Sequence, residues 1–283
     1  MSSAYADLDR PPLSERGLNR ALVTSGSLWS RVEVRTRTGS TNADAALAAQ
    51  EGAAEGLVVV AEVQDAGRGR RDRQWHSPPR AGLTLSVLLK PGVPDPERGL
   101  PAVPPGALGW LPLLAGVALA GAVTRVTELE ARLKWPNDLL VGDRKCAGIL
   151  AEMAGDTVVV GMGLNVTTRS EELPETTGVP ATSLRLAGAT VTDRDPLLRA
   201  LLRGFDRWYT GWREADGDAE MCGLLGEYRR LCATIGRPVR VLLPAGGELR
   251  GEAVTVDNDG QLVIRTEEGA EERVSAGDVL HVR

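Results

Sequence analysis

Hydrophobic and polar positions along the first 235 residues form two kinds of pattern, which predict strands and helices in a mixed order. Alternating or continuously apolar runs rich in β-branched residues predict strands. These strands cover residues 31–37, 57–64, 83–89, 131–135, 138–141, 145–153 and 157–162. Helices are predicted at residues 14–23, 41–49, 110–126, 196–213 and 220–232. Because the strands cluster instead of alternating strictly with helices, the pattern favours an α+β fold with a mixed sheet.

The pattern changes after Gly236. Residues 237–283 contain five short β-rich runs separated by Gly, Asn and Asp, and no convincing helix. This spacing predicts a small barrel of about five strands. We therefore expect a flexible N-terminus at residues 1–13, a larger domain at residues 14–235 and a C-terminal barrel at residues 236–283.

Charge and metal-binding residue types narrow the function classes. The 283 residues include 33 Lys+Arg against 38 Asp+Glu, a net charge of −5. A general nucleic-acid binder needs a basic face, so nucleic acid is not an expected partner. The three cysteines form no CxxC pair and the two histidines lie far apart in the sequence. A zinc site is therefore disfavoured, and free thiols in a reducing compartment are expected.

No segment indicates export or a membrane. The N-terminus lacks the basic-then-apolar pattern of a signal peptide. The longest apolar stretch, Trp110–Val126, contains Pro112 and two glycines. This stretch is more typical of a core helix than of a membrane span. We expect a cytoplasmic protein with no membrane partner.

Positive charge is concentrated in one short segment of this acidic chain. Residues 67–73, GRGRRDR, hold two glycines, four arginines and one acid; we call them the arginine loop. Guanidinium groups suit phosphate or carboxylate, and Gly67 and Gly69 permit close backbone approaches. The alternative is a solvated surface loop. Because like charges repel, we expect the loop to be mobile until an anion binds.

A second candidate lies where a strand passes into a helix, in the sequence TGSTNADA at residues 38–45. Thr41 with Asp44 fits a helix-capping box. The same position also suits ligand binding, because hydroxyls and free N–H groups at a helix start can surround a small polar group. Further along, Thr192 and Asp195 provide capping signals for the helix that starts at Pro196.

A third candidate is the segment at residues 134–150, KWPNDLLVGDRKCAGIL. Lys134, Asp138 and Lys145 can hold a phosphate and a magnesium ion together, because lysines neutralise oxygens and a carboxylate is a hard metal ligand. The alternative is a hairpin with ordinary surface charges. Gly148 permits a ligand to lie against the strand. Cys146 has no histidine nearby in sequence, so a nucleophilic role is disfavoured. The segment GMGLN at residues 161–165 is a weaker candidate for contact with a planar ring.

Together and in this order, these segments resemble bacterial biotin protein ligases. The matching pieces are STN at 40–42, EVQDAGRGRRDRQWHSP at 62–78, KWPNDL at 134–139, RKCAGIL at 144–150, GMGLNV at 161–166 and IGRPV at 235–239. The resemblance spans roughly residues 35–283. It implies a mixed-sheet catalytic domain of the biotin/lipoate ligase type, followed by an SH3-like barrel. It also implies that biotin and MgATP form biotinyl-5′-AMP, from which biotin passes to one lysine of a biotin carboxyl carrier domain of an acyl-CoA carboxylase.

The resemblance assigns roles to individual residues. It implies biotin contacts for Ser40, Thr41, Asn42, Gln64, Arg68, Gly69, Arg70, Lys145 and Gly148. It implies ATP contacts for Arg68, Arg71, Arg73, Trp75, Lys134 and Asn165, with Asp138 near the metal. The residues expected to carry catalysis are Lys145, Lys134, Asp138 and Arg70.

Two other functions remain open at this point. Lipoate and octanoate ligases share the fold and also transfer an acyl group to a carrier lysine, although the GRGRR and KWPND segments favour biotin. A non-catalytic biotin or nucleotide sensor would keep the pocket without turnover. Some family members carry an N-terminal helix-turn-helix. Only about 35 residues precede the matched region here, so repressor activity is not expected.

Overall fold

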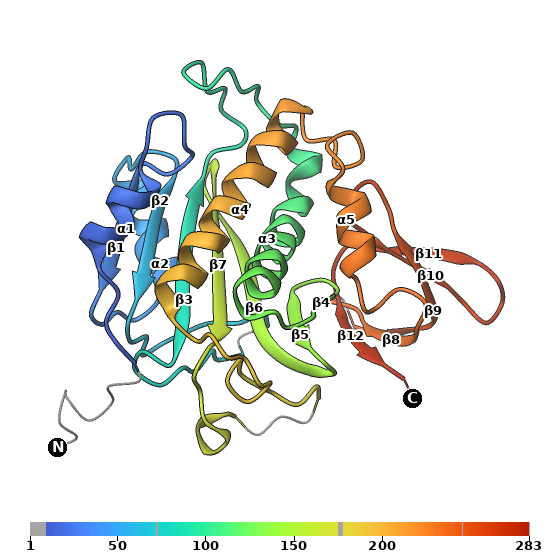
Figure 1. Cartoon of the computed structure of the whole chain (residues 1–283). Helices are drawn as coiled ribbons and strands as arrows, with labels where there is room; N and C mark the ends of the chain where they lie inside the picture. Colours follow the sequence, from blue (N-terminus) through green and yellow to red (C-terminus); the bar gives the residue numbers. More distant parts are fainter. Residues whose placement is uncertain (1–9, 72, 175–177, 245, 283) are drawn as a thin grey trace.

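Two β-sheets organise the chain, and the larger one carries most of the helices. The computed structural model describes residues 10–71, 73–174, 178–244 and 246–282. In Figure 1 the larger sheet and its helices form the body of the molecule, and the smaller sheet lies to one side, beyond the last helix. The site described below depends on how the loops of the first sheet meet the second.

The larger sheet has seven strands in the order β1-β2-β3-β7-β6-β5-β4. β1 and β2 pair in parallel, and the other neighbours pair antiparallel, which confirms the predicted mixed sheet. The strands are β1 (Arg31–Arg35), β2 (Leu57–Ala61), β3 (Gly82–Leu89), β4 (Ala131–Lys134), β5 (Asp138–Val141), β6 (Arg144–Ala154) and β7 (Thr157–Asn165).

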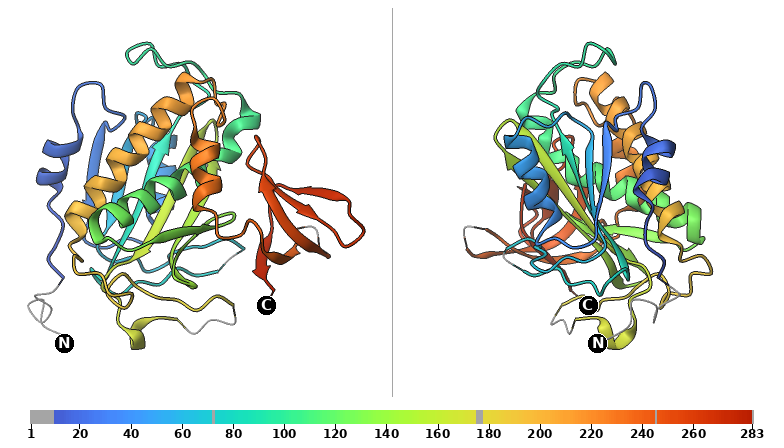
Figure 2. Two further views of the ribbon diagram at one scale, coloured as in Figure 1. Left: turned by 45° about the vertical axis from the view of Figure 1, so that its right-hand side comes forward. Right: turned by 90° about the vertical axis from the view of Figure 1, so that its left-hand side faces the viewer.

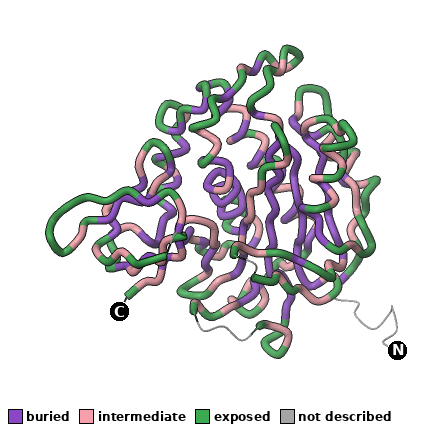
Figure 3. The backbone as a smooth tube through the Cα atoms, turned by 180° about the vertical axis from the view of Figure 1, so that it is seen from behind, coloured by how far each residue is buried: buried purple, intermediate pink, exposed green. Residues whose placement is uncertain are grey.

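Helices cover both faces of this sheet (Figure 2). On one face lie α1 (Glu15–Leu22), α3 (Trp110–Thr127) and α4 (Arg194–Glu214), and α2 (Thr41–Gln50) lies on the other. Alternate residues of β2 show the division: Val58 and Val60 join the main core, whereas Leu57 and Val59 pack in the smaller core beside α2. Burial on both faces explains why the central strands are almost continuously apolar, and Figure 3 shows them buried along their length.

The second sheet is a five-stranded antiparallel unit with the order β11-β10-β9-β8-β12. Its strands are β8 (Pro238–Leu242), β9 (Glu248–Val256), β10 (Leu262–Arg265), β11 (Glu271–Val274) and β12 (Asp278–His281). These are the five runs predicted from the tail, and they form the small SH3-like barrel. The helix α5 (Leu224–Leu231) lies between this barrel and α3.

Helix starts differ from the predictions for local reasons. α4 begins at Arg194, capped by the Asp193 side chain, because proline at residue 196 fits within a first turn whose N–H groups have no helical partner. α5 begins four residues later than predicted, after Gly223 in a left-handed conformation. The predicted flexible N-terminus falls mostly outside the described residues. Arg10, however, is only 5% exposed and bonds to Glu172 and to Thr167.

The apolar helix predicted at residues 110–126 is a core element. Pro105–Thr127 is long and apolar enough to cross a membrane by length and composition, but 67% of its most apolar window is buried. α4 lies along α3 in Figure 1, and α4 presents an apolar face that includes Leu198, Leu202 and Phe205. The spacing of three to four residues between these side chains is that of an amphipathic helix packed on its neighbours.

A buried ion pair joins α4 to the sheet. Arg194 Nη1 lies 2.6 Å from Glu62 Oε2, and the two side chains are 4% and 5% exposed. Arg194 Nη2 also donates to the Pro11 carbonyl, and Glu62 Oε1 accepts from the Leu13 N–H. The pair therefore ties the N-terminal segment, the strand end and α4 together.

We predict that Arg194→Met lowers the free energy of unfolding by about 3 kcal/mol, because the Glu62 carboxylate is left buried without its charge partner. Chemical denaturation measures this change. The matched control is Arg230→Met, which removes an exposed pair with Glu227 and costs at most about 1 kcal/mol. Equal losses in the two variants would contradict the assigned importance of the buried pair.

Candidate active site

A cavity of about 460 Å³ opens where loops of the large sheet face the barrel. This volume lies in the range of small-molecule sites. Its lining brings together segments that are far apart in the sequence. The predicted site residues that line it are Ser40, Thr41, Asn42, Gln64, Arg68, Gly69, Arg70, Arg73, Trp75, Lys134, Asp138, Lys145, Gly148 and Asn165. Arg71 belongs to the same loop but is directed to the barrel.

The start of α2 forms a polar floor. Ser40, not Thr41, is the N-cap, and its hydroxyl accepts from the Ala43 N–H. The predicted capping box is therefore wrong, and Asp44 instead accepts a hydrogen bond from Thr38. The Thr41 N–H donates to Gln64 Oε1 over 2.9 Å, which places the ends of β2 and the start of α2 on the same side of the cavity.

Ser86 and Glu152 fix the orientation of the floor. Ser86 Oγ is fully buried and lies 2.7 Å from Thr41 Oγ1 and 2.6 Å from Asn42 Oδ1. Asn42 Nδ2 donates to Glu152 Oε2 over 2.6 Å. The two ends of the Asn42 amide are thus held by different strands, so its donor and acceptor sides are set before any ligand enters.

The arginine loop folds into a small hairpin over the cavity. The Trp75 N–H donates to the Gly67 carbonyl, and the Gly69 N–H donates to the Arg73 carbonyl. A Cβ on Gly67 would lie 2.3 Å from Gln64 Nε2 and 2.3 Å from the Trp75 carbonyl. Close approach, not an unusual backbone angle, is therefore the reason for glycine at residue 67. The left-handed conformation belongs to Arg71, with φ of 54°.

Each arginine of the loop has an acceptor among the described residues. Arg68 pairs with Glu152, and Arg70 Nη1 donates to Asn137 Oδ1 over 3.1 Å. Arg71 and Arg73 both pair with Asp278 of the barrel, at 3.2 and 2.9 Å. The expected repulsion is thus offset by carboxylates from β6 and β12. Burial lowers the pKa of Arg70, and the charge of Asp278 opposes that change.

Two lysines meet one carboxylate at the opposite wall. Asp138 lies across from Lys134 in the β4–β5 pairing and from Gly148 in the β5–β6 pairing. Lys145 Nζ lies 2.7 Å from Asp138 Oδ1, and Lys134 Nζ lies 3.9 Å from Asp138 Oδ2. Burial lowers the pKa of Lys134, while Asp138 favours its charged form. A negatively charged ligand would relieve the excess of positive charge here.

Trp75 lies against two glycines of the sheet. A Cβ on Gly163 would lie 2.3 Å from Trp75 Cε2, and one on Gly148 would lie 3.4 Å from Trp75 Cζ3. The indole Nε1 is buried and lacks a hydrogen-bond partner within the described ranges. The flat glycine surface thus holds the ring in the cavity with an indole donor still available.

Asn165 forms part of the cavity wall, and the buried Cys146 lies behind it. Asn165 Nδ2 donates to the Thr182 carbonyl over 3.0 Å, and Cys146 Sγ contacts the Asn165 carbonyl. One donor of the Asn165 amide is thus already used within the protein. Burial raises the pKa of the Cys146 thiol to about 12, which agrees with its exclusion as a nucleophile. The described residues contain no cluster of three or more His, Cys, Asp or Glu that could hold a metal ion.

Comparisons with known proteins show the family of this chain. Residues 34–166 match the model of the biotin/lipoate A/B protein ligase family, and residues 234–282 match that of the biotin protein ligase C-terminal domain. The chain is 42% identical to the biotin–[acetyl-CoA-carboxylase] ligase of Mycobacterium tuberculosis over 97% of both chains. It belongs to the biotin protein ligase family.

Other relatives support the same membership. A ligase of the same name from Paracoccus denitrificans is 31% identical over 81% of this chain and 92% of its own. The structure of the Aquifex aeolicus biotin protein ligase in complex with biotin and ATP superposes with a TM-score of 0.73 and 28% identity, covering 90% of this chain and all of that one. The predicted family and fold are therefore confirmed.

Three residues that support or line the cavity of this biotin protein ligase were missed by sequence reasoning. Ser86 had a usable signal, since Thr84 and Ser86 are the polar positions within the apolar strand GLTLSVLL and share one face. Glu152 shares a face with Gly148 and Leu150 on β6 by the same two-residue period. Asp278 had no local signal, because its partners lie about 200 residues earlier and are brought close only by the docking of the barrel.

We predict that Gly163→Ala raises the apparent KM for nucleotide at least tenfold while the melting temperature changes by only a few degrees. The new methyl group cannot share space with the Trp75 ring, so the ring must leave its place in the cavity. Steady-state kinetics and thermal melting measure the two effects. The control is Gly121→Ala, where a Cβ meets nothing within 4 Å. Unchanged nucleotide kinetics in Gly163→Ala would show that Trp75 has no part in binding.

Proposed function

We propose that this enzyme activates biotin with ATP as biotinyl-5′-AMP and transfers biotin to a lysine of a biotin carboxyl carrier domain of an acyl-CoA carboxylase. The observation that carries the proposal is the meeting of two lysines and one carboxylate with the arginine loop over a small polar floor. A cavity with this charge distribution suits a ligand with a polar head, an apolar middle and several phosphates. Biotin and ATP together have those parts.

The polar floor suits the ureido ring of biotin. This ring has one strong acceptor and two N–H donors, so its site needs hydroxyl and amide groups of both polarities. Ser40, Thr41 and Gln64 supply them, and Asn42 supports their arrangement through Ser86 and Glu152. The aliphatic tail then runs along an apolar wall, for which the cavity offers Leu85, Ile149, Leu150 and Met162.

The cationic residues suit the phosphates and the carboxylate. Lys145 neutralises the biotin carboxylate and the α-phosphate, so that two anions can approach each other. Lys134, with Arg68, Arg70, Arg71 and Arg73, accommodates the remaining phosphate charge, and Gly69 and Gly148 leave room for the ligand backbone. Trp75 offers its ring and indole N–H to the nucleotide, and Asn165 retains acceptor capacity toward the adenine.

Mg²⁺ fits this donor set only as an ion shared with ATP. Magnesium usually retains several waters and is held by one or two carboxylates together with substrate phosphates. Asp138 is the carboxylate placed for this, already beside both lysines. When bound, the ion would neutralise phosphate charge.

The chemistry requires no covalent bond to the protein. A biotin carboxylate oxygen attacks the α-phosphorus, the bond from that phosphorus to the bridging oxygen breaks, and pyrophosphate leaves with the electron pair. The neutral amine of the carrier lysine then attacks the biotinyl carbonyl carbon. The C–O bond to AMP breaks, AMP leaves, and the amine proton passes to solvent. The arginine loop excludes water from the mixed anhydride between the two steps.

The wider setting follows from the same proposal. The catalytic domain comprises residues 14–235 and the barrel comprises residues 236–283. The carrier domain docks with its lysine-bearing hairpin beside the cavity, in the cytoplasm. Neither nucleic acid nor a membrane is a partner.

The decisive experiment incubates the protein with biotin, MgATP and a purified carrier domain and measures the mass of the carrier. One added biotinyl group on a single lysine is the expected result. Lipoate and octanoate in place of biotin test the related acyl ligases, and modification by either in preference to biotin would overturn the proposal. Biotin-dependent pyrophosphate exchange tests for a sensor, which would bind biotin without exchange.

We predict an alkaline loss of kcat/KM for ATP that depends on Lys134. Because burial lowers its pKa, Lys134 loses its charge in the free enzyme at a lower pH than an ordinary lysine does. The rate therefore falls as pH rises through that lowered pKa. In Lys134→Arg the charge persists, so the fall moves to higher pH, whatever the absolute rate. Pre-steady-state or steady-state rates between pH 7 and pH 10 measure the profile, with Lys90→Arg as the control. Superimposable profiles for Lys134→Arg and wild type would refute the assignment.

A further inference from the structure

Asp278 is a barrel residue whose side chain pairs with the arginine loop. It opens β12 and lies opposite Leu242 in the β8–β12 pairing. Its two carboxylate oxygens accept from Arg71 Nη1 at 3.2 Å and from Arg73 Nη2 at 2.9 Å. Arg71 Nη2 also donates to the Leu242 carbonyl over 2.8 Å. The Asp278 carboxylate and the Leu242 carbonyl, which are neighbours in the barrel, thus bind Arg71 and Arg73 of the loop.

Other hydrogen bonds also join the barrel to the body of the molecule. Trp110 Nε1 donates to the Asn258 carbonyl over 2.6 Å, and Trp135 Nε1 donates to the Gly260 carbonyl over 3.0 Å. Arg229 adds two bonds to the Val256 carbonyl from α5. These bonds, two of them from the buried indoles of Trp110 and Trp135, hold residues 256–260 of the barrel against the body. The contribution of Asp278 is therefore specific to the loop.

The loop, in contrast, depends on few other contacts. Arg73 is 59% exposed and Arg68 is 53% exposed, and the Arg68 pair with Glu152 is long at 3.5 Å. Asp278 is 23% exposed, so its charge is less screened by water than theirs. Within the described ranges, Asp278 and Glu152 are the carboxylates within ion-pair distance of the loop arginines. Removal of Asp278 leaves Arg71 and Arg73 without a carboxylate within ion-pair distance among the described residues.

We propose that Asp278 is a positioning residue, through which the C-terminal barrel holds the arginine loop over the cavity before and after the nucleotide binds. The carboxylate acts through Arg71 and Arg73 and does not touch the reacting atoms. In the ligand-free protein it keeps the loop folded. With the adenylate bound it slows the opening that would release the intermediate. This last consequence rests on the proposed function, whereas the effect on the loop does not.

The first test is hydrogen–deuterium exchange of the ligand-free full-length protein. In Asp278→Asn, which keeps the shape and removes the charge, amides of residues 67–75 should exchange about fivefold faster, as expected for the loss of two partly exposed ion pairs. The Gly69 and Trp75 amides are the reporters, because their bonds close the hairpin. Asp278→Glu should restore most of the protection. The control, Glu271→Gln, breaks the Arg265 pair of the same barrel.

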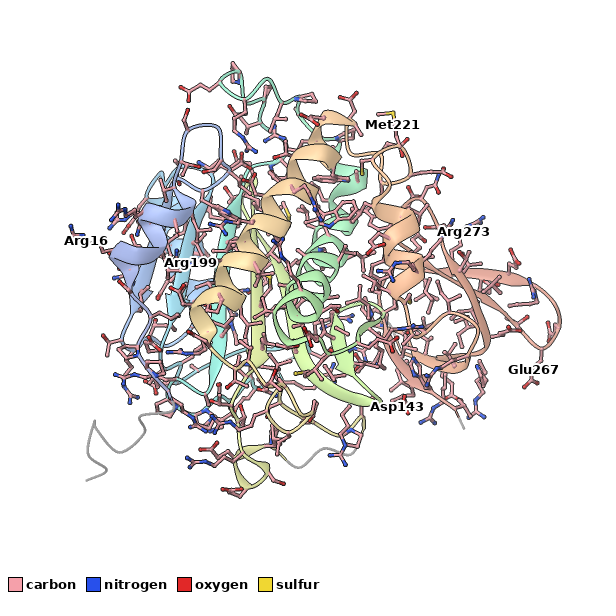
Figure 4. All side chains as sticks on the ribbon, in the orientation of Figure 1. Arg16, Asp143, Arg199, Met221, Glu267 and Arg273 are labelled. Carbon is pink, nitrogen blue, oxygen red and sulfur yellow. The ribbon has the colours of Figure 1, made fainter. Side chains whose placement is uncertain are left out.

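The control pair is well separated from the cavity. Glu267 marks the tip of the β10–β11 hairpin, at the end of the barrel far from the body (Figure 4), and Glu271 and Arg265 pair along that hairpin. Unchanged exchange of residues 67–75 in Asp278→Asn would overturn the proposal. Faster exchange throughout the barrel would also overturn it, because Asp278 would then be a general docking contact.

The second test measures release of biotinyl-5′-AMP from the preformed complex. The release rate should rise about fivefold in Asp278→Asn and remain at the wild-type value in Glu271→Gln, with the KM for biotin changed less than twofold. An unchanged release rate would overturn the role in retention. If wild type forms no adenylate, the proposed function fails, and the exchange experiment still decides whether Asp278 holds the loop. If Asp278→Asn does not fold, Arg73→Gln removes one of the same pairs from the exposed loop and must accelerate exchange there.

Discussion

The need to balance concentrated positive charge governs the arrangement of this site. Two lysines and three arginines line one cavity, and Arg71 of the arginine loop lies beside it. Like charges this close repel strongly unless water or counter-charges intervene. Three carboxylates from three different elements supply the counter-charge: Asp138 on β5 between the lysines, Glu152 on β6 beside Arg68, and Asp278 on β12 beside Arg71 and Arg73. These carboxylates offset only part of the positive charge, so an incoming polyanion supplies counter-charge to cations that the carboxylates already hold in place.

The cationic residues belong to two different kinds of structure, paired strands and a loop. Lys134, Asp138 and Lys145 belong to paired strands of the large sheet, so their spacing is fixed by strand register. The arginines stand on a hairpin of nine residues whose closing bonds are few. A rigid wall suits the atoms that must be aligned for phosphoryl transfer. A loosely held loop suits a cover that must open once for each substrate and product.

The fold and most of the cavity could be predicted from the sequence because their signals are local. Strand periodicity, the apolar faces of α3 and α4 and the clustered arginines all lie within short windows. The missing parts depend on residues distant in sequence. Thr41 fitted a capping box, yet Ser40 takes the cap, and the Thr41 N–H donates to Gln64, three residues beyond the end of β2. The arginine loop looked unbalanced because its partners, Glu152 and Asp278, meet it only in the folded chain.

The C-terminal barrel both docks on the body of the molecule and contacts the arginine loop. It docks through indole and guanidinium donors that reach backbone carbonyls of the barrel at Asn258, Gly260 and Val256. Backbone acceptors do not change charge with pH or with a ligand, so these docking bonds do not depend on a titrating acceptor. Asp278 and the Leu242 carbonyl are consequently held at a fixed place beside the loop. The Asp278 carboxylate beside the arginine loop favours the closed position of the loop even without a ligand. Closure stays reversible because the ion pairs are partly exposed and individually weak. The barrel thus uses one set of contacts to dock on the body and another set, at Asp278, to act on the arginine loop. Through the second set it can influence how readily the site opens.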